Sequence, residues 1–121
     1  MPAVILHVDD SPSVRLWVSE VLKDDRFRII SASDGVEALN ILATTSIDLL
    51  LSDFEMPRID GLELAKAARN LPQHRYLPIL MFSTRRAEEI SEKKRSPVTG
   101  WISKPVDPAL LRRWVLRLLP G

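Results

Sequence analysis

The chain has 121 residues, a net charge of +1 and no cysteine. We therefore expect one domain over residues 1–121, with a core that needs no disulfide, and we exclude thiolate metal sites. An aromatic content of 6% argues against a nucleic-acid domain, and without an apolar run of about 20 residues or a signal-like N-terminus we expect a cytoplasmic protein without membrane insertion.

The first half of the chain contains three predicted strands and two predicted helices. "AVILHV" at Ala3–Val8 is predicted as a buried strand, and a helix follows that Ser11 caps and Pro12 begins. The β-rich segment Phe27–Ala32 precedes a helix that starts after "SDG", and Asp48–Ser52 is the third strand. Helical spacing is shown by Val14, Trp17, Val18, Val21 and Leu22, and then by Val36, Ala38, Leu39, Ile41 and Leu42.

The second half continues the alternation. Leu62–Leu71 is predicted as a helix, and the connector "LPQHRYLP" leads to a strand at Pro78–Ser83. Residues 85–95 have few apolar anchors, which predicts a short, weakly held helix. Trp101–Ser103 is a brief strand, and a final helix starts at Pro108. A wide apolar stripe for the core comes from Leu110, Leu111, Trp114, Val115, Leu118 and Leu119.

Five strands alternating with five helices predict an α/β fold, a doubly wound five-stranded parallel sheet covered on both faces. Such sheets bind ligands outside the carboxyl ends of their strands. The predicted strands end at or next to Asp9 and Asp10, Asp53, Ser83 and Lys104. These side chains are therefore expected to converge at one edge of the sheet.

Three converging carboxylates imply a bound cation, because each close pair repels by a few kcal/mol at an effective dielectric near 20. Oxygen ligands without a cysteine or histidine cluster favour Mg²⁺. A carboxylate beside a metal, an ammonium group and a hydroxyl is equipped to attack phosphorus. The pattern therefore predicts an aspartyl phosphate on Asp53, with Lys104 and Ser83 assisting.

Taken singly, each of these residues also has an ordinary structural explanation. Asp9 and Asp10 can cap a helix, Asp53 can form a turn, Ser83 can end a strand, and Lys104 can be a solvated surface residue. Their ordered positions at several strand ends favour the functional interpretation. A histidine inside the first strand, by contrast, is predicted to be a packed core residue rather than a ligand.

Charge is distributed unevenly along the chain. Residues 1–60 hold 5 Lys/Arg and 11 Asp/Glu, a balance of −6, whereas residues 61–121 hold 12 Lys/Arg and 5 Asp/Glu, a balance of +7. This asymmetry suggests a metal-binding end and a separate basic surface. Chance clustering of solvated charges is the alternative.

The motifs "VDDS", "SDFEMPRIDG", "MFS" and "KP" resemble those of the response-regulator receiver domain, and the resemblance covers essentially the whole chain. "GVEAL" and "TGWISKP" are similar to stand-alone, chemotaxis-type receivers. The resemblance implies a flavodoxin-like (βα)5 fold with strand order 2-1-3-4-5. It also implies two-component, phosphorelay signalling, with a histidine kinase as phosphodonor and no enzymatic activity beyond the chain's own phosphorylation and dephosphorylation.

The resemblance assigns the metal and phosphoryl sites residue by residue. Asp53 matches the phosphoacceptor and, with Asp10, a Mg²⁺ ligand. Asp9 matches the acidic neighbour that assists through water, and Glu55 occupies the position whose backbone carbonyl binds the metal.

The resemblance also implies a switch. Ser83 matches the switch hydroxyl, Lys104 the partner of the phosphoryl group, and Trp101 the switch aromatic, while a cis bond is implied before Pro105. A phosphoryl group adds about −1.5 to −2 charges. Ser83 and Lys104 are expected to move towards it and Trp101 to turn inward, which changes the 85–119 surface. That predicted output face, suited to an acidic downstream protein, carries Arg85, Arg86, Lys93, Lys94, Arg95, Arg112, Arg113 and Arg117.

Three departures from the family pattern leave other functions open. Glu55 adds a carboxylate beside the acceptor, Pro97 lies in a short segment that predicts a distorted or mobile fourth helix, and Trp101 is bulkier than the usual Tyr or Phe. A phosphate-independent interaction module is the main alternative. A Mg²⁺-dependent phosphohydrolase is a further one, although Glu55 only partly imitates the second acidic residue that such an enzyme needs.

Overall fold

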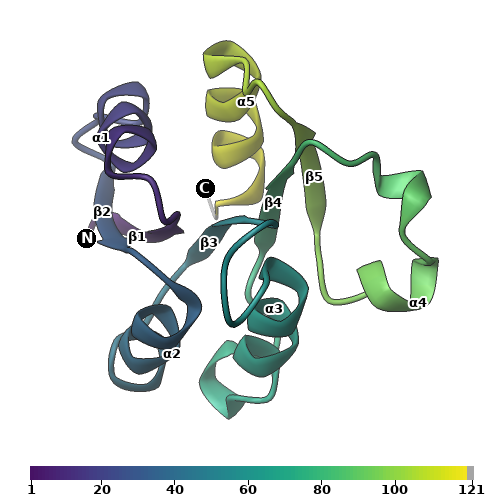
Figure 1. Cartoon of the computed structure of the whole chain (residues 1–121). Coiled ribbons are helices and arrows are strands. Elements are labelled where there is room, and N and C mark those ends of the chain that lie inside the picture. The colour runs from purple at the N-terminus through teal and green to yellow at the C-terminus, as the bar shows by residue number, and fades with distance from the viewer. Residues whose placement is uncertain (120–121) are drawn as a thin grey trace.

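The structure is a computed structural model that describes residues 1–119. Figure 1 shows the chain as a central sheet with flanking helices. The strands are β1 (Ala3–Val8), β2 (Phe27–Ala32), β3 (Leu49–Asp53), β4 (Ile79–Ser83) and β5 (Gly100–Ser103). The helices are α1 (Pro12–Val21), α2 (Gly35–Thr44), α3 (Gly61–Arg69), α4 (Glu92–Arg95) and α5 (Pro108–Leu118), with short 3-10 turns η1 (Pro72–His74) and η2 (Ala87–Glu89).

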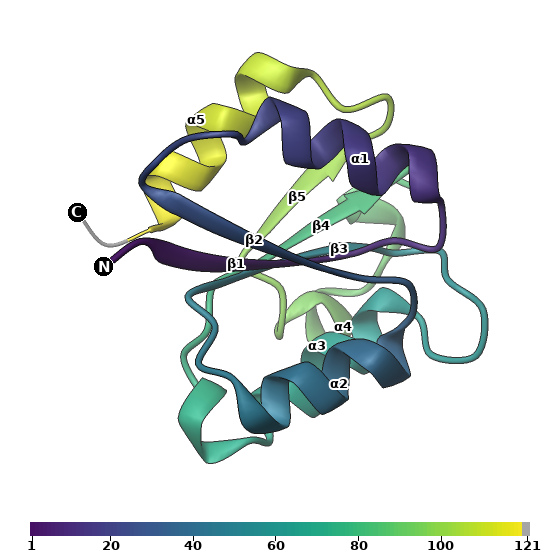
Figure 2. The ribbon, with the colours of Figure 1, turned by 90° about the vertical axis from the view of Figure 1, so that its left-hand side faces the viewer.

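The strands form one parallel sheet in the order β2-β1-β3-β4-β5, which confirms the predicted fold class and strand order. Helices α1 and α5 cover one face, and α2, α3 and α4 lie on the other (Figure 2). Val8 pairs in register with Ser52, and Ser83 with Ser103. The carboxyl ends of β1, β3, β4 and β5 therefore lie along the same edge of the sheet.

The core lies on both sides of β3, whose five residues are all buried. Leu50 belongs to the apolar cluster under α2 and α3, whereas Leu49 and Leu51 belong to the cluster under α1 and α5. Successive side chains of a strand point to opposite faces, so a strand buried on both faces must be apolar throughout. The run "LLL" therefore requires helices on both sides of the sheet.

Side-chain caps determine where helices α1 and α3 begin. The Ser11 hydroxyl accepts a hydrogen bond from the Val14 amide at 3.3 Å, and Pro12 occupies the first turn of α1. Asp60, which follows the predicted site loop, caps α3 in a reciprocal capping box with Glu63. This cap directs the chain away from β3 immediately after the acidic loop.

Several boundaries differ from the predicted ones. Strand β3 spans Leu49–Asp53 rather than Asp48–Ser52, because the Asp48 carboxylate accepts the Val4 amide hydrogen bond at 2.8 Å and Asp53 stays within the strand. The predicted connector contains the turn η1. The predicted fourth helix at 85–95 is two separate short pieces, η2 and α4, because its only buried residue is Ile90. Within residues 1–119, no helix is long and apolar enough to cross a membrane.

Candidate functional site

The first feature of the site is a group of three carboxylates. Asp9 and Asp10 follow β1, and Asp53 is the last residue of β3. One carboxylate oxygen from each lies within 4.8 Å of the others. Asp9 and Asp53 are buried, whereas Asp10 is exposed. Parallel strand ends thus bring these residues together as the sequence predicts.

Asp9 is held in place by the loop that follows β1 and by helix α1. One of its carboxylate oxygens accepts the Ser11 amide hydrogen bond at 2.9 Å, and the Arg15 guanidinium donates to its main-chain carbonyl at 2.6 Å. Burial raises the pKa of Asp9, partly offset by the Ser11 amide, and the charge of Asp53 raises it further. A cation at this position would relieve that cost, because it favours the ionised carboxylates.

Lys104 faces the phosphoacceptor candidate directly. Its ammonium donates a hydrogen bond to Asp53 Oδ1 at 2.6 Å, and the Asp53 side chain is only 5% exposed. Burial raises the pKa of Asp53, although the Lys104 hydrogen bond and charge oppose this. Burial lowers the pKa of Lys104, but the bond to Asp53 outweighs it and the net direction is upward. The Lys104–Pro105 peptide bond is cis.

The Glu55 side chain forms a second cluster beside the first. Its Oε1 accepts hydrogen bonds from Ser83 Oγ at 2.9 Å and from Thr84 Oγ1 at 3.1 Å, and its other oxygen lies 3.6 Å from Lys104 Nζ. Burial raises the pKa of Glu55, but the two hydroxyls and Lys104 outweigh it and lower the pKa. Glu55 is therefore ionised, and it already interacts with Ser83 and Lys104, the two residues that are predicted to bind the phosphoryl group.

Trp101 connects this edge to the neighbouring surface. It is half-buried, and its indole Nε1 donates to the Arg85 carbonyl at 3.1 Å. Its ring centroid lies 5.5 Å from that of Phe54, and the Arg85 guanidinium lies 5.8 Å from the Phe54 ring centre. Phe54, which follows Asp53, and Arg85, which lies two residues after Ser83, therefore both contact Trp101, the predicted switch aromatic.

The structure brings together the side chains of Asp9, Asp10, Asp53 and Lys104, and Ser83 joins this group through Glu55. Trp101 instead contacts Phe54 and Arg85. Sequence reasoning missed Thr84, although a second hydroxyl directly after Ser83 was a visible signal. It also missed Arg15, whose position gave no signal because the contact depends on the path of the chain after β1. His7 is a fully buried core residue in the first strand. The three carboxylates are hard oxygen donors close enough to share one ion, so they fit Mg²⁺.

The chain matches the family described as the response regulator receiver domain over residues 5–116. It is 34% identical over 118 residues to the cyclic di-GMP phosphodiesterase response regulator RpfG of Xanthomonas campestris pv. campestris, covering 95% of this chain but 31% of that protein. The chain therefore spans about a third of that relative's length.

Solved structures show the same likeness across the whole chain. Chemotaxis protein CheY4 of Vibrio cholerae superposes with a TM-score of 0.90 at 36% identity, covering 98% of this chain and 100% of that one. TrrA of Thermotoga maritima, solved in complex with Mg²⁺ and BeF, gives a TM-score of 0.85 at 29% identity and covers 97% and 99%. This chain thus belongs to the response regulator receiver domain family.

Proposed function

We propose that residues 1–121 act as one phosphoacceptor receiver domain, in which Asp53 accepts a phosphoryl group from a histidine kinase. The observation that carries the proposal is the environment of Asp53: a buried carboxylate bonded to Lys104 at 2.6 Å and grouped with Asp9 and Asp10 within 4.8 Å. Receiver domains are signalling proteins that take phosphoryl groups from histidine kinases and act on downstream partners.

The transfer follows from this arrangement. An Asp53 carboxylate oxygen attacks the phosphorus of a phosphohistidine, so that an O–P bond forms as the N–P bond breaks. The bonding electron pair remains on the histidine ring nitrogen. Lys104 neutralises charge on the phosphoryl oxygens, as ammonium groups do at phosphoryl-transfer sites. In this scheme the chain also catalyses its own dephosphorylation by water, and it acts on no other substrate.

The proposed metal ligands are the carboxylates of Asp10 and Asp53 and the backbone carbonyl of Glu55, with Asp9 assisting through water. Mg²⁺, when bound there, neutralises negative charge shared between the acceptor and the incoming phosphoryl group. The Asp9–Ser11 hydrogen bond supports this proposal, because it fixes the direction of one acidic side chain.

The proposed switch is a change of partner. Ser83 and Lys104 leave Glu55 and bind the phosphoryl oxygens, because an acceptor carrying about −1.5 to −2 charges competes well with a single carboxylate. Loss of the Ser83 contact changes the β4–η2 segment to which Trp101 is bonded. The proposed output is altered binding of an acidic downstream protein at the basic 85–119 face, without direct nucleic-acid binding. We place this function in the cytoplasm, where kinases obtain ATP.

Intact mass spectrometry after incubation with acetyl phosphate and Mg²⁺ tests the acceptor role. We expect one phosphoryl adduct on the wild type, none on Asp53→Asn, and loss of the adduct with EDTA. An adduct that persists on Asp53→Asn would assign the acceptor to another residue.

A phosphate-independent interaction module is the second candidate, and one observation favours it. Glu55 already supplies Ser83 and Lys104 with an anionic partner in the unphosphorylated chain. A folded wild type that binds Mg²⁺ but takes no phosphoryl group from acetyl phosphate or from a panel of histidine kinases would support this module.

A further inference from the structure

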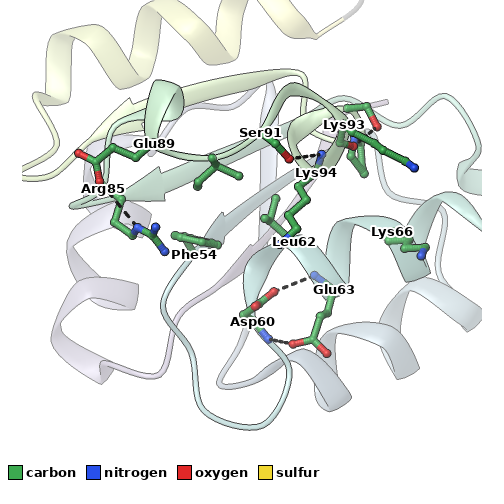
Figure 3. A pocket seen from close by; sticks show the side chains of 13 residues that line it. Phe54, Asp60, Leu62, Glu63, Lys66, Arg85, Glu89, Ser91, Lys93 and Lys94 are labelled. Atoms are coloured by element: carbon green, nitrogen blue, oxygen red, sulfur yellow. Dashed lines mark hydrogen bonds and ion pairs between the residues drawn. The ribbon is translucent and has the colours of Figure 1, made fainter.

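A groove of about 980 Å³ lies between the start of α3 and the η2–α4 segment (Figure 3). Apolar side chains line its floor, namely Phe54 and Ile90, both nearly buried, and the half-buried Leu62 and Pro97. An apolar surface of this kind, rimmed by charged residues, is typical of a binding site.

The groove is open because the chain does not build a full helix over it. Helix α4 has four residues and η2 has three, and neither contains a buried residue. Ile90, which lies between them, is the single buried anchor of residues 85–95. The side of α3 that a longer helix would cover is therefore left accessible.

One end of the groove carries uncompensated positive charge. Lys66, Lys93 and Lys94 are exposed. In Figure 3, Lys66 and Lys93 lie on the side opposite Arg85 and Glu89, and Lys94 lies between, next to Leu62. Among residues 1–119, none of the three ammonium groups has a carboxylate within 4.0 Å. An anionic partner would therefore form ion pairs with these three lysines without displacing an existing ion pair.

The acidic residues of the lining are already engaged within the chain. Asp60 and Glu63 accept each other's amide hydrogen bonds at 2.8 and 3.1 Å in the α3 capping box, and Glu89 lies 3.8 Å from Arg85. Negative charge therefore stays at the α3 start and at the Arg85 end. The charge pattern orients an acidic ligand towards the lysine end.

We propose that this groove binds an acidic segment of a partner protein, with one bulky apolar side chain over Phe54 and Ile90 and flanking Asp or Glu residues at Lys66, Lys93 and Lys94. Apolar anchors supply affinity in such sites, and complementary charge supplies orientation and specificity. The inference deepens the proposed function, because it names the α3–α4 groove rather than α5 as the docking place. Binding itself requires no phosphoryl group.

The test uses a random-peptide display library selected against the unphosphorylated wild type in EDTA, so that the outcome is independent of phosphorylation. We expect selected peptides in which Asp or Glu residues flank a Leu, Ile, Phe or Trp. The amide resonances of Lys66, Ile90 and Lys94 in ¹⁵N-labelled protein should shift when a selected peptide is added. This wild-type measurement stands even if a variant folds poorly.

A matched pair of charge reversals locates the site. The triple variant Lys66→Glu, Lys93→Glu, Lys94→Glu should weaken the selected peptides by at least about tenfold, since three attractive charges become repulsive. The control triple variant Lys23→Glu, Arg28→Glu, Arg75→Glu changes three exposed residues outside the groove and outside the 85–119 face. It makes the same change in charge and should leave their affinity within about twofold. Peptides without acidic residues, or an equal loss of affinity in the control variant, would overturn the proposal.

Discussion

At the scale of single residues, Glu55 is the position where this chain departs most from what its motifs predict. Its side chain contacts two hydroxyl donors, Ser83 and Thr84, and the Lys104 ammonium group. Ser83 and Lys104 are also the residues that the proposed phosphoryl group needs. The side chain is 40% exposed, so its charge also reaches the path of an incoming anion. Glu55 is therefore expected to oppose phosphorylation in two ways, by repulsion and by competition.

The variant Glu55→Gln should react faster with acetyl phosphate, by about fivefold to tenfold, which corresponds to roughly 1 kcal/mol of lowered barrier. The amide keeps an acceptor for Ser83 but removes the negative charge. The initial rate of adduct formation by intact mass measures this. Thr84→Val is the control, because it removes one Glu55 contact without changing charge, and its rate should stay close to wild type. An unchanged or slower rate for Glu55→Gln would contradict the repulsion.

At the scale of elements, β4 and β5 are joined by the path from Ser83 through Arg85 to Trp101. The Ser83 hydroxyl accepts the Arg85 amide at 2.9 Å, and the Arg85 carbonyl accepts the Trp101 indole N–H at 3.1 Å. A movement of Ser83 towards a phosphoryl group therefore changes the hydrogen bonding of the indole.

Ser83→Ala should still be phosphorylated on Asp53 but should lose most of the fluorescence change that phosphorylation causes in the wild type. The hydroxyl is the group that links the phosphoryl site to Arg85. Trp101→Phe identifies the emitting residue, because Trp17 and Trp114 also emit. A full fluorescence response in phosphorylated Ser83→Ala would remove this link from the mechanism.

Helix α3 starts so close to β3 that its first residue must be small. A Cβ on Gly61 would lie 2.7 Å from the Asp53 carbonyl oxygen and 2.9 Å from Phe54 Cα, both of which are backbone atoms. Gly61→Ala should therefore cost about 1–3 kcal/mol of stability, measured by urea unfolding. Gly35→Ala is a close control, since Gly35 also begins a helix after an Asp cap but would meet the Ile59 side chain at 3.0 Å. Its cost should be smaller, and equal costs would contradict this comparison.

At the scale of the whole molecule, two buried histidines make stability depend on pH. Burial lowers the pKa of His7 to about 4, with a further contribution from the Arg15 charge, and burial also lowers the pKa of His74. As the pH falls, the two histidines of the unfolded chain become protonated near pH 6.5, whereas those of the folded chain become protonated only at lower pH. The stability contribution is therefore complete above about pH 6.5 and is lost as the pH falls towards 4.

His7→Leu should flatten this dependence, because leucine removes the largest difference in proton binding. Within residues 1–119 neither ring nitrogen of His7 has a hydrogen-bond partner, so an apolar residue loses no such contact. Between pH 7 and pH 4, the free energy of unfolding measured by urea titration without Mg²⁺ should fall by up to about 3 kcal/mol less in the variant than in the wild type. The raised pKa values of Asp9 and Asp53 act in the opposite direction and are shared by both proteins. A slope equal to that of the wild type would exclude His7 as its source.

Much of the fold and the placement of Asp9, Asp53 and Lys104 could be predicted, because strand ends in a parallel sheet share an edge and local patterns reveal where strands end. Asp48 shows the limit of that reasoning: its side chain bonds to the Val4 amide on another strand, so β3 starts one residue later than its pattern suggests. The division of 85–95 into η2 and α4 was also not predictable, since a charged segment with one buried anchor has no strong periodicity.

The sequence by itself determined the parallel α/β fold, the acidic edge and the likeness to receiver domains, because these depend on hydrophobic periodicity and on residues next to strand ends. Only the tertiary structure decided what Glu55 contacts, how Trp101 is bonded to Arg85, and that α3 and α4 leave a groove with a lysine end. Those features depend on side chains from segments far apart in the chain, and their distances are set by packing rather than by local sequence.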